Sequence, residues 1–124
     1  KVVFGDIADE EGKAVEAEIR TNGGDAHYRH LDVTSADDWQ AAVSFAVDTF
    51  GKLDGLVHNA AELGPRTLLD SVKPEAWMRV MQVNVNAPFV LTRAMMPLLR
   101  AADAGQLGEA VQADACAALA SICV

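Results

Sequence analysis

The chain is poor in positive charge and contains no long apolar run. Its 124 residues include 10 lysines and arginines against 18 aspartates and glutamates, which gives a formal net charge of -8. This balance argues against nucleic acid or an anionic membrane as a partner, because both require a basic face. No run of 18 apolar residues occurs, so the sequence predicts no membrane-spanning helix.

Cysteine is also scarce. The two cysteines, Cys116 and Cys123, lack metal-ligand spacing, and free thiols are favoured over a disulfide or a metal site. A charged-then-apolar leader is missing as well, so we expect a soluble, cytoplasmic protein. The length suits one domain with a real core and is too short for two.

Strand-like and helix-like patterns alternate along the first hundred residues, an order that predicts a parallel α/β sheet. Ser35 is a favourable N-cap with Asp38 at the capping-box position, and Gly51 is a favourable helix end. The expected strands are 1–4, 26–31 and 53–57. One helix is expected after Asp9 and a second after Ser35. A third should run from Pro74 to about Arg100, with a kink or division at Pro88.

The stretch 53–61, LDGLVHNAA, organises the rest of the pattern. Its apolar centre is bounded by turn signals and lies between two helical patterns, which predicts a buried parallel strand. Ligands of open α/β sheets bind just outside the carboxyl ends of the strands. Asn59 at that point offers a hydrogen-bond donor and an acceptor, and the small Ala60 and Ala61 allow close approach to the backbone.

Polar residues follow all three expected strands, and the carboxyl ends of parallel strands lie along one edge. Asp6 could accept hydrogen bonds from the two hydroxyls of an adenosine ribose, or it could cap the following helix, and its sequence position leaves both interpretations open. With Ile7 rather than a basic residue next to it, Asp6 would favour NAD over NADP. Asp32, taken alone, is more typical of a loop or cap residue.

The histidines and the helical asparagines are weaker signals. His58 stands without partner carboxylates or cysteines, as packed or solvated histidines usually do. His27 and His30 would lie on opposite faces of a strand, which disfavours a metal pair. Asn84 and Asn86 lie in a helical pattern next to a proline, where asparagine is unfavourable, and this suggests a local break in the helix.

Together these residues resemble the short-chain dehydrogenase/reductase family from Lys1 to about Gly105. The strand-end acid is Asp6, the Asp-Val pair is Asp32-Val33, and the Asn-Asn-Ala-Gly signature reads His58-Asn59-Ala60-Ala61, a departure at both ends. The helical asparagine of the family matches Asn84. Residues 1–57 look most like NAD-dependent hydroxysteroid-type or acyl-carrier-protein-reductase-like members of the family. Residues 58–105 look more like a bacterial subgroup in which the signature begins His-Asn-Ala. This mixture leaves the substrate open.

The resemblance implies a Rossmann-type doubly wound sheet and an NAD-dependent oxidoreductase that moves a hydride between nicotinamide and an alcohol or ketone. The cofactor NAD would be held by Asp6, Ile7, Asp32, Val33, Asn59, Ala60 and Ala61. Asn84 would break the helix and hold a water of the proton relay through its main chain. Family members pair along the helix that corresponds to 74–100, so a homodimer or homotetramer is expected.

Two defining parts of the family pattern are missing. The Gly-rich phosphate turn should precede Lys1, and the catalytic Ser and the Tyr-x-x-x-Lys should follow Gly105, whereas the chain's one tyrosine, Tyr28, lies in an expected strand. The family's first strand would lie between 2–4 and 56–57, so the Rossmann sheet would be incomplete. We therefore expect residues 1–105 to be a partial NAD-binding domain from a protein about twice as long.

The remaining residues, 106–124, fit this pattern poorly. An alanine-rich segment, 109–119, is expected to be a helical tail of the same domain, 119–124 could form a strand, and Ser121 is disfavoured as the catalytic serine.

Two rival functions stay open. One is a non-catalytic nucleotide-binding or regulatory module, and the other is a receiver domain, which the absence of a lysine at the strand ends disfavours.

Overall fold

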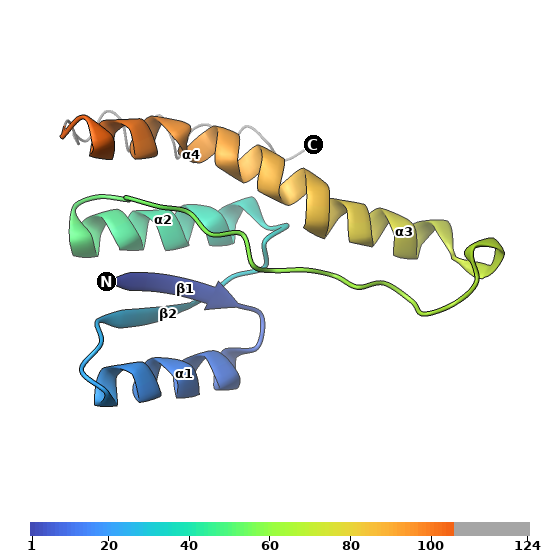
Figure 1. Ribbon diagram of the computed structural model, residues 1–124, viewed down its shortest axis with the longest axis horizontal. Coiled ribbons are helices and arrows are strands. Elements are labelled where there is room, and N and C mark those ends of the chain that lie inside the picture. The colour runs from blue at the N-terminus through green and yellow to red at the C-terminus, as the bar shows by residue number, and fades with distance from the viewer. Residues whose placement is uncertain (106–124) are drawn as a thin grey trace.

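A computed structural model describes residues 1–105 as a layered α/β arrangement (Figure 1). The expectations for 106–124, including the helical tail, the strand and Ser121, fall outside the described residues. In chain order the elements are β1 (Val2–Asp6), α1 (Asp9–Thr21), β2 (Ala26–His30), α2 (Ala36–Phe50), a 3-10 turn (Leu69–Ser71), α3 (Pro74–Met81), a π-helical segment (Gln82–Asn86) and α4 (Ala87–Asp103).

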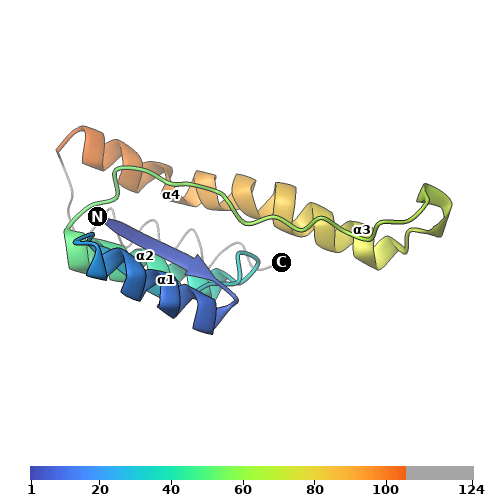
Figure 2. The same cartoon turned by 60° about the horizontal axis from the view of Figure 1, so that its bottom comes forward.

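The two strands form a parallel pair, as the alternating pattern predicts. Val2 pairs with Ala26 at one end, and Asp6 pairs with His30 at the other. Helix α1 covers one face of this pair and α2 covers the other (Figure 1). The carboxyl ends of both strands therefore meet at one edge (Figure 1), and Figure 2 shows the end of β1 from a second side.

The ends of α2 confirm the signals in its sequence. The Ser35 hydroxyl accepts a hydrogen bond from the Asp38 N–H at 3.3 Å and donates one to Asp38 Oδ1 at 2.9 Å. Gly51 ends the helix at φ 78°, a left-handed conformation that glycine adopts without a Cβ penalty.

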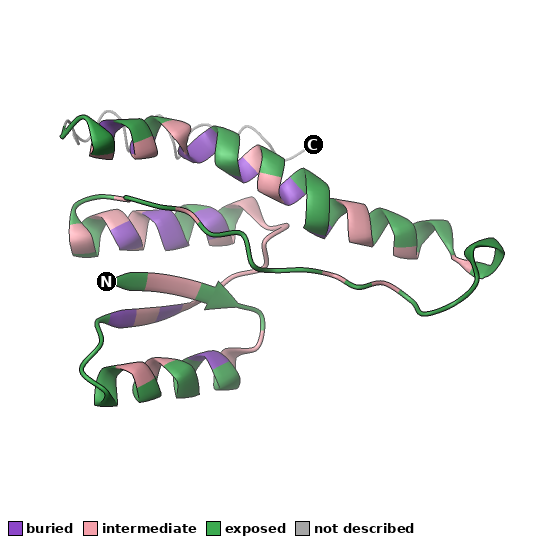
Figure 3. Ribbon diagram, viewed as in Figure 1, coloured by how far each residue is buried: buried purple, intermediate pink, exposed green. Residues whose placement is uncertain are grey.

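The main core lies between α2 and α4, whose facing sides are buried (Figure 3). Met95 and Leu98 of α4 are fully buried, and Trp39 and Val43 of α2 pack in the same cluster with Leu91. Burial of an apolar side chain of this size contributes about 1.5–3 kcal/mol, so this contact fixes α4 along α2. Among the helices of residues 1–105, none is long and apolar enough to cross a bilayer.

The prediction of a third strand at 53–57 is wrong. This segment belongs to an irregular connection that runs from α2 towards α3 (Figure 1), and Val57 is 85% exposed. A strand needs a neighbour for its backbone hydrogen bonds, and β1 pairs with β2 alone within the described part of the chain. Leu53 and Leu56 still pack against the α2–α4 core, so the apolar pattern of this stretch reflects its contact with the core.

The long helical pattern is divided in two, as expected, but the break precedes Pro88. The Ala87 N–H donates to the carbonyl of Gln82, five residues back, which is the hydrogen bond of a π turn. Proline has no N–H, so Pro88 cannot donate to the carbonyl of Asn84 four residues earlier. The proline and the two asparagines together explain why the regular helix gives way here.

Candidate functional site

The carboxyl ends of β1 and β2 are tied together directly. The N–H of Leu31, the first residue after β2, donates to the Asp6 carbonyl at 3.0 Å. The side chain of Asp6 caps the turn into α1, because its Oδ1 accepts the Ala8 N–H at 3.0 Å. Asp6 is nevertheless exposed, and the neighbouring Ile7 side chain is 62% exposed, so both remain accessible at this edge.

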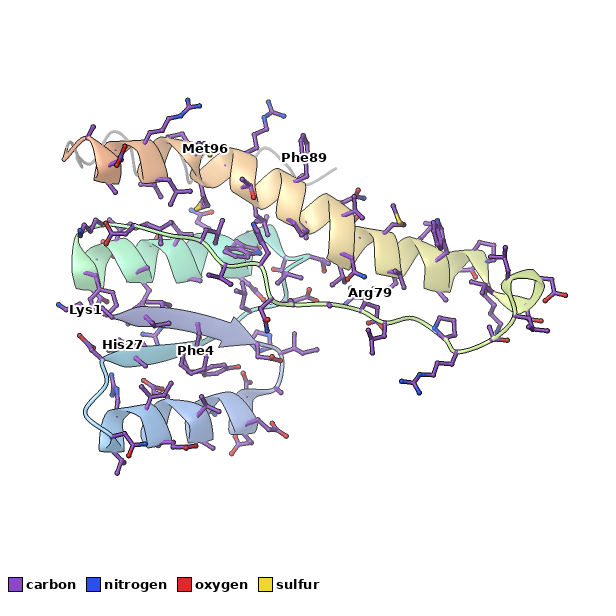
Figure 4. All side chains as sticks on the ribbon, viewed as in Figure 1. Lys1, Phe4, His27, Arg79, Phe89 and Met96 are labelled. Atoms are coloured by element: carbon purple, nitrogen blue, oxygen red, sulfur yellow. The ribbon has the colours of Figure 1, made fainter. Side chains whose placement is uncertain are left out.

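Asp32 organises the loop after β2. Its Oδ1 accepts hydrogen bonds from the Thr34 N–H at 2.8 Å and from the Thr34 hydroxyl at 2.7 Å. These hydrogen bonds, aided by the nearby Arg79 guanidinium, hold the pKa of Asp32 below its ordinary value. Arg79 reaches the loop from α3 (Figure 4), with Nη2 3.9 Å from Asp32 Oδ2. The loop therefore carries a permanently ionised carboxylate at neutral pH.

Val33 is held in place by the core beneath the loop. Its carbonyl accepts a hydrogen bond from the Trp39 indole N–H at 3.2 Å, and its side chain packs against the α2–α4 cluster. Asp32 and Val33 thus form a fixed pair beside Asp6.

The segment Asn59–Ala61 is anchored at both ends. On one side, the His58 Nε2 lies 2.9 Å from the Thr92 hydroxyl of α4, and the ring packs beside Trp39. On the other side, the amide of Asn84 donates to the Glu62 carbonyl and accepts the Glu62 N–H, both at 2.8 Å. The three residues between these anchors are exposed, and two of them carry only a methyl group.

The helical break at Asn84 is therefore coupled to this loop. The side chain of Asn84 is fully used in its pair with Glu62, and its carbonyl lacks the α-helical donor that Pro88 removes. A carbonyl in such a break can accept a hydrogen bond from another donor, water included. Asn86 has a local role, because its amide donates to the Gln82 side chain at 3.0 Å.

The structure thus gathers the candidate residues into two groups. Asp6, Ile7, Asp32 and Val33 lie at the strand ends, and Asn59, Ala60 and Ala61 lie beside the break at Asn84. Within residues 1–105, no group of three or more His, Cys, Asp or Glu side chains is arranged to hold a metal ion.

One polar cluster at the strand ends was missed by the sequence analysis. The Tyr28 hydroxyl lies 2.7 Å from both Asp9 Oδ1 and the Asp6 carbonyl, and His30 Nδ1 lies 2.9 Å from the same Asp9 oxygen. In the sequence, Asp9 marks only the start of an expected helix. The spacing of Tyr28 and His30, two apart on a strand, places both on one face, but the sequence does not say that α1 covers that face.

The charges of this cluster follow from these contacts. Burial and the hydrogen bond to Asp9 raise the pKa of Tyr28 to about 12, so it stays neutral near pH 7. Hydrogen bonds from Tyr28 and His30 lower the pKa of Asp9, and the bond to Asp9 raises the pKa of His30. The cluster thus holds an ionised carboxylate, a neutral phenol and a histidine that is protonated more readily than usual.

Comparison with known proteins agrees with the motifs. The family profile described as short chain dehydrogenase matches residues 1–118. Two curated relatives are the 3-alpha-(or 20-beta)-hydroxysteroid dehydrogenase of Mycobacterium tuberculosis, 46% identical over 107 residues, and the cyclopentanol dehydrogenase of a Comamonas species, 38% identical over 104. The alignments cover 86% and 84% of this chain but 40% and 41% of the relatives, so the chain spans less than half their length.

Solved structures of the family share the arrangement of the elements. A metagenomic short-chain oxidoreductase in complex with NADP superimposes with a TM-score of 0.74 at 30% identity, over 95% of this chain and 58% of that one. The 3-ketoacyl-(acyl-carrier-protein) reductase of Brucella melitensis, complexed with NADH, gives 0.75 at 28% identity, over 98% and 55%. The two strands and their helices are thus part of a Rossmann-type α/β fold, and the chain belongs to the short-chain dehydrogenase family.

Proposed function

We propose that this chain is part of an NAD-dependent oxidoreductase that transfers a hydride between the nicotinamide cofactor and an alcohol or ketone. One observation carries the proposal: Asn84 lies in a π-helical break, and its amide pairs with the main chain of Glu62, directly after Asn59–Ala61. This pair joins two segments. The family resemblance assigns 59–61 to the cofactor and Asn84 to the proton relay.

The residues at the strand ends suit the adenosine half of the cofactor. Asp6 offers an exposed carboxylate to the ribose hydroxyls, and Asp32 and Val33 offer a fixed loop to the adenine. The exposed backbone of Asn59–Ala61, with small side chains at two of three positions, would hold the cofactor near its nicotinamide ribose. Bound there, the nicotinamide would supply the hydride chemistry.

Asn84 would act through its main chain. Because its amide is committed to Glu62, the carbonyl is the group left to hold a water of the proton relay. The side chain thus positions the loop while the backbone serves the proton path.

The choice of NAD over NADP rests on Asp6. Its carboxylate would repel a 2′-phosphate, and Ile7 provides no compensating charge. Among the similar structures, one is a complex with NADP and another with NADH, so the family accommodates both.

Titration of the full-length protein with both cofactors tests this choice. We expect wild type to bind NAD at least about tenfold more tightly than NADP, and Asp6→Asn to remove most of that difference. Asp25→Asn, at the opposite end of β2, is the matched control and should leave the ratio unchanged. Equal affinity of wild type for the two cofactors contradicts the assignment of Asp6.

The activity itself is tested by NADH formation with ring alcohols. The relatives above are named for a hydroxysteroid and for cyclopentanol, so cyclic secondary alcohols are the substrates to offer first. NAD-dependent turnover supports the oxidoreductase. Tight NAD binding without turnover of any alcohol or ketone would instead favour a nucleotide-binding or regulatory module.

We also propose that a second copy of this chain pairs along α3 and α4. Trp77, Met78 and Phe89 are 56%, 65% and 67% exposed on these helices, and Phe89 points away from α2 (Figure 4). Large apolar side chains gathered on an outer helix face favour association. A homodimer or homotetramer would cover them.

A further inference from the structure

A continuous series of polar contacts joins the loop after β1 to the loop after β2. It begins at the Asp6 carbonyl and passes through the Tyr28 hydroxyl to the Asp9 carboxylate, over two contacts of 2.7 Å each. Asp9 Oδ1 then lies 2.9 Å from His30 Nδ1. The other ring nitrogen, Nε2, lies 3.8 Å from Asp38 Oδ2, and that oxygen accepts the Asp32 N–H at 2.9 Å.

His30 is the centre of this series and the one member that changes its charge near neutral pH. His30 is half exposed, and the charged groups near its ring are acidic: Asp9 on α1, Asp38 on α2, and Asp32 in the following loop. The nearest cations act on these acids rather than on the ring, with Lys13 near Asp9 and Arg79 near Asp32. Protonation of His30 therefore adds a positive charge among carboxylates.

We propose that His30 is a positioning residue that, when protonated, clamps α1 to α2 and so fixes the two loops that hold the adenosine end of the cofactor. This inference rests on the proposed function for its consequence, though the clamp itself is a property of the described residues.

The two nitrogens of the ring explain why the charge matters. An imidazolium donates from both nitrogens, so it can bind Asp9 and Asp38 at the same time. A neutral imidazole has one N–H, and with that proton directed at Asp9 the lone pair of Nε2 faces the Asp38 carboxylate. Deprotonation therefore replaces an attraction across the strand ends by a repulsion.

The raised pKa of His30 brings this change into the range near neutral pH. At lower pH the clamp holds Asp9 and Asp38 together, and Asp38 in turn holds the backbone of Asp32. The adenosine loops are then ordered before the ligand arrives. At higher pH that ordering must take place on binding, and affinity falls.

Calorimetric titration of the full-length protein with ADP-ribose tests the consequence, because this probe carries the adenosine end and cannot be turned over. We expect wild type to bind about fivefold more tightly at about pH 6 than at about pH 8.5. His30→Gln should lose this pH dependence. The control His27→Gln should retain it, because His27 pairs with Asp25 and Glu16 at the other end of β2. An unchanged pH profile in His30→Gln overturns the proposal.

Thermal unfolding tests the clamp without any ligand. Folding raises the pKa of His30, so protonated His30 stabilises the folded state. This stabilisation is complete below the pKa of the unfolded chain, about 6.5, and is lost as the pH rises through the pKa of the folded protein. Wild type should therefore exceed His30→Gln by about 3 °C in Tm at about pH 6 and by less at about pH 8.5. The same difference at both pH values overturns the clamp. Failure of wild type to bind ADP-ribose at either pH would contradict the proposed function, and the unfolding data would still decide the clamp.

Discussion

At the scale of single residues, the loop after β2 depends on the hydroxyl of Thr34. That hydroxyl and the Thr34 N–H both bind Asp32 Oδ1, and the ionised carboxylate closes the turn. Thr34→Val keeps the shape of the side chain and removes one of the two donors. We expect a loss of about 1 kcal/mol in the free energy of unfolding at neutral pH.

The pH dependence of that loss identifies its cause. The folded pKa of Asp32 is lowered, so the stability it contributes is present above the ordinary value of 3.8 and is lost as the pH falls through the folded value. The difference in the free energy of unfolding between wild type and Thr34→Val, measured by urea unfolding, should therefore become smaller in acid. Thr21→Val is the control, because its hydroxyl donates to the uncharged carbonyl of Ala17 and its effect should not follow the titration of a carboxylate.

Gly12 is required by the close approach of the Tyr28 ring. A Cβ at this position of α1 would overlap the ring, although alanine is the better helix former by about 1 kcal/mol. We expect Gly12→Ala to destabilise the protein by about 1–3 kcal/mol in chemical denaturation. Gly55→Ala, where a Cβ meets nothing within 4 Å, should be neutral or slightly stabilising. Equal effects of the two substitutions would contradict the packing of Tyr28 against α1.

Single residues also show where sequence analysis reaches its limit at the site. The strand-end position of Asp6 and the unfavourable helical position of Asn84 were visible as local patterns. The partner of Asn84 was not, because Glu62 lies 22 residues away and contributes backbone atoms that carry no sequence signal. The link from Asp9 to His30 was missed for a similar reason, since it depends on which strand face α1 covers.

At the scale of elements, the two prolines of α4 provide a matched comparison. Both lack the N–H of a helix residue, but Pro88 follows the π segment and Pro97 lies inside the regular helix. Pro97→Ala restores a hydrogen bond to a helix that is already regular, so we expect greater stability and unchanged turnover. Pro88→Ala offers a donor to the Asn84 carbonyl and should lower kcat by about tenfold. Equal kcat in the two variants would contradict a role for that carbonyl.

The elements with local start and stop signals were predicted well. Both ends of α2 and the parallel direction of β1 and β2 are confirmed, because capping residues and the alternation of strand and helix patterns are visible in short stretches of sequence. The strand at 53–57 was wrong, because hydrogen bonding of a strand depends on a neighbour and not on the segment itself. The break near Pro88 was expected, but its π geometry depends on which carbonyl Ala87 binds, and composition does not determine that choice.

At the scale of the whole molecule, the outer face of α3 and α4 should control association. Phe89→Asp places a charge in the proposed contact between two copies, where it would be buried without a partner. We expect this variant to be monomeric in sedimentation and to keep its far-UV circular dichroism. Val15→Asp, on the exposed side of α1, is the control and should leave the oligomeric state unchanged. A wild-type protein that is monomeric at micromolar concentration would contradict the pairing.

The π segment can also be considered as one surplus residue in the count between α3 and α4. The Ala87 N–H lies five residues after the Gln82 carbonyl that it binds, so one widened turn takes up one residue more than an α-helical turn holds. Deleting one position between them would let the same donor and acceptor close a regular α-helical turn, and the two helices would keep their orientation. With α4 fixed on α2 by Met95 and Leu98, Trp77 and Met78 of α3 would then stay on the outer surface. The extra residue therefore serves the break at Asn84, and the outer apolar surface does not depend on it.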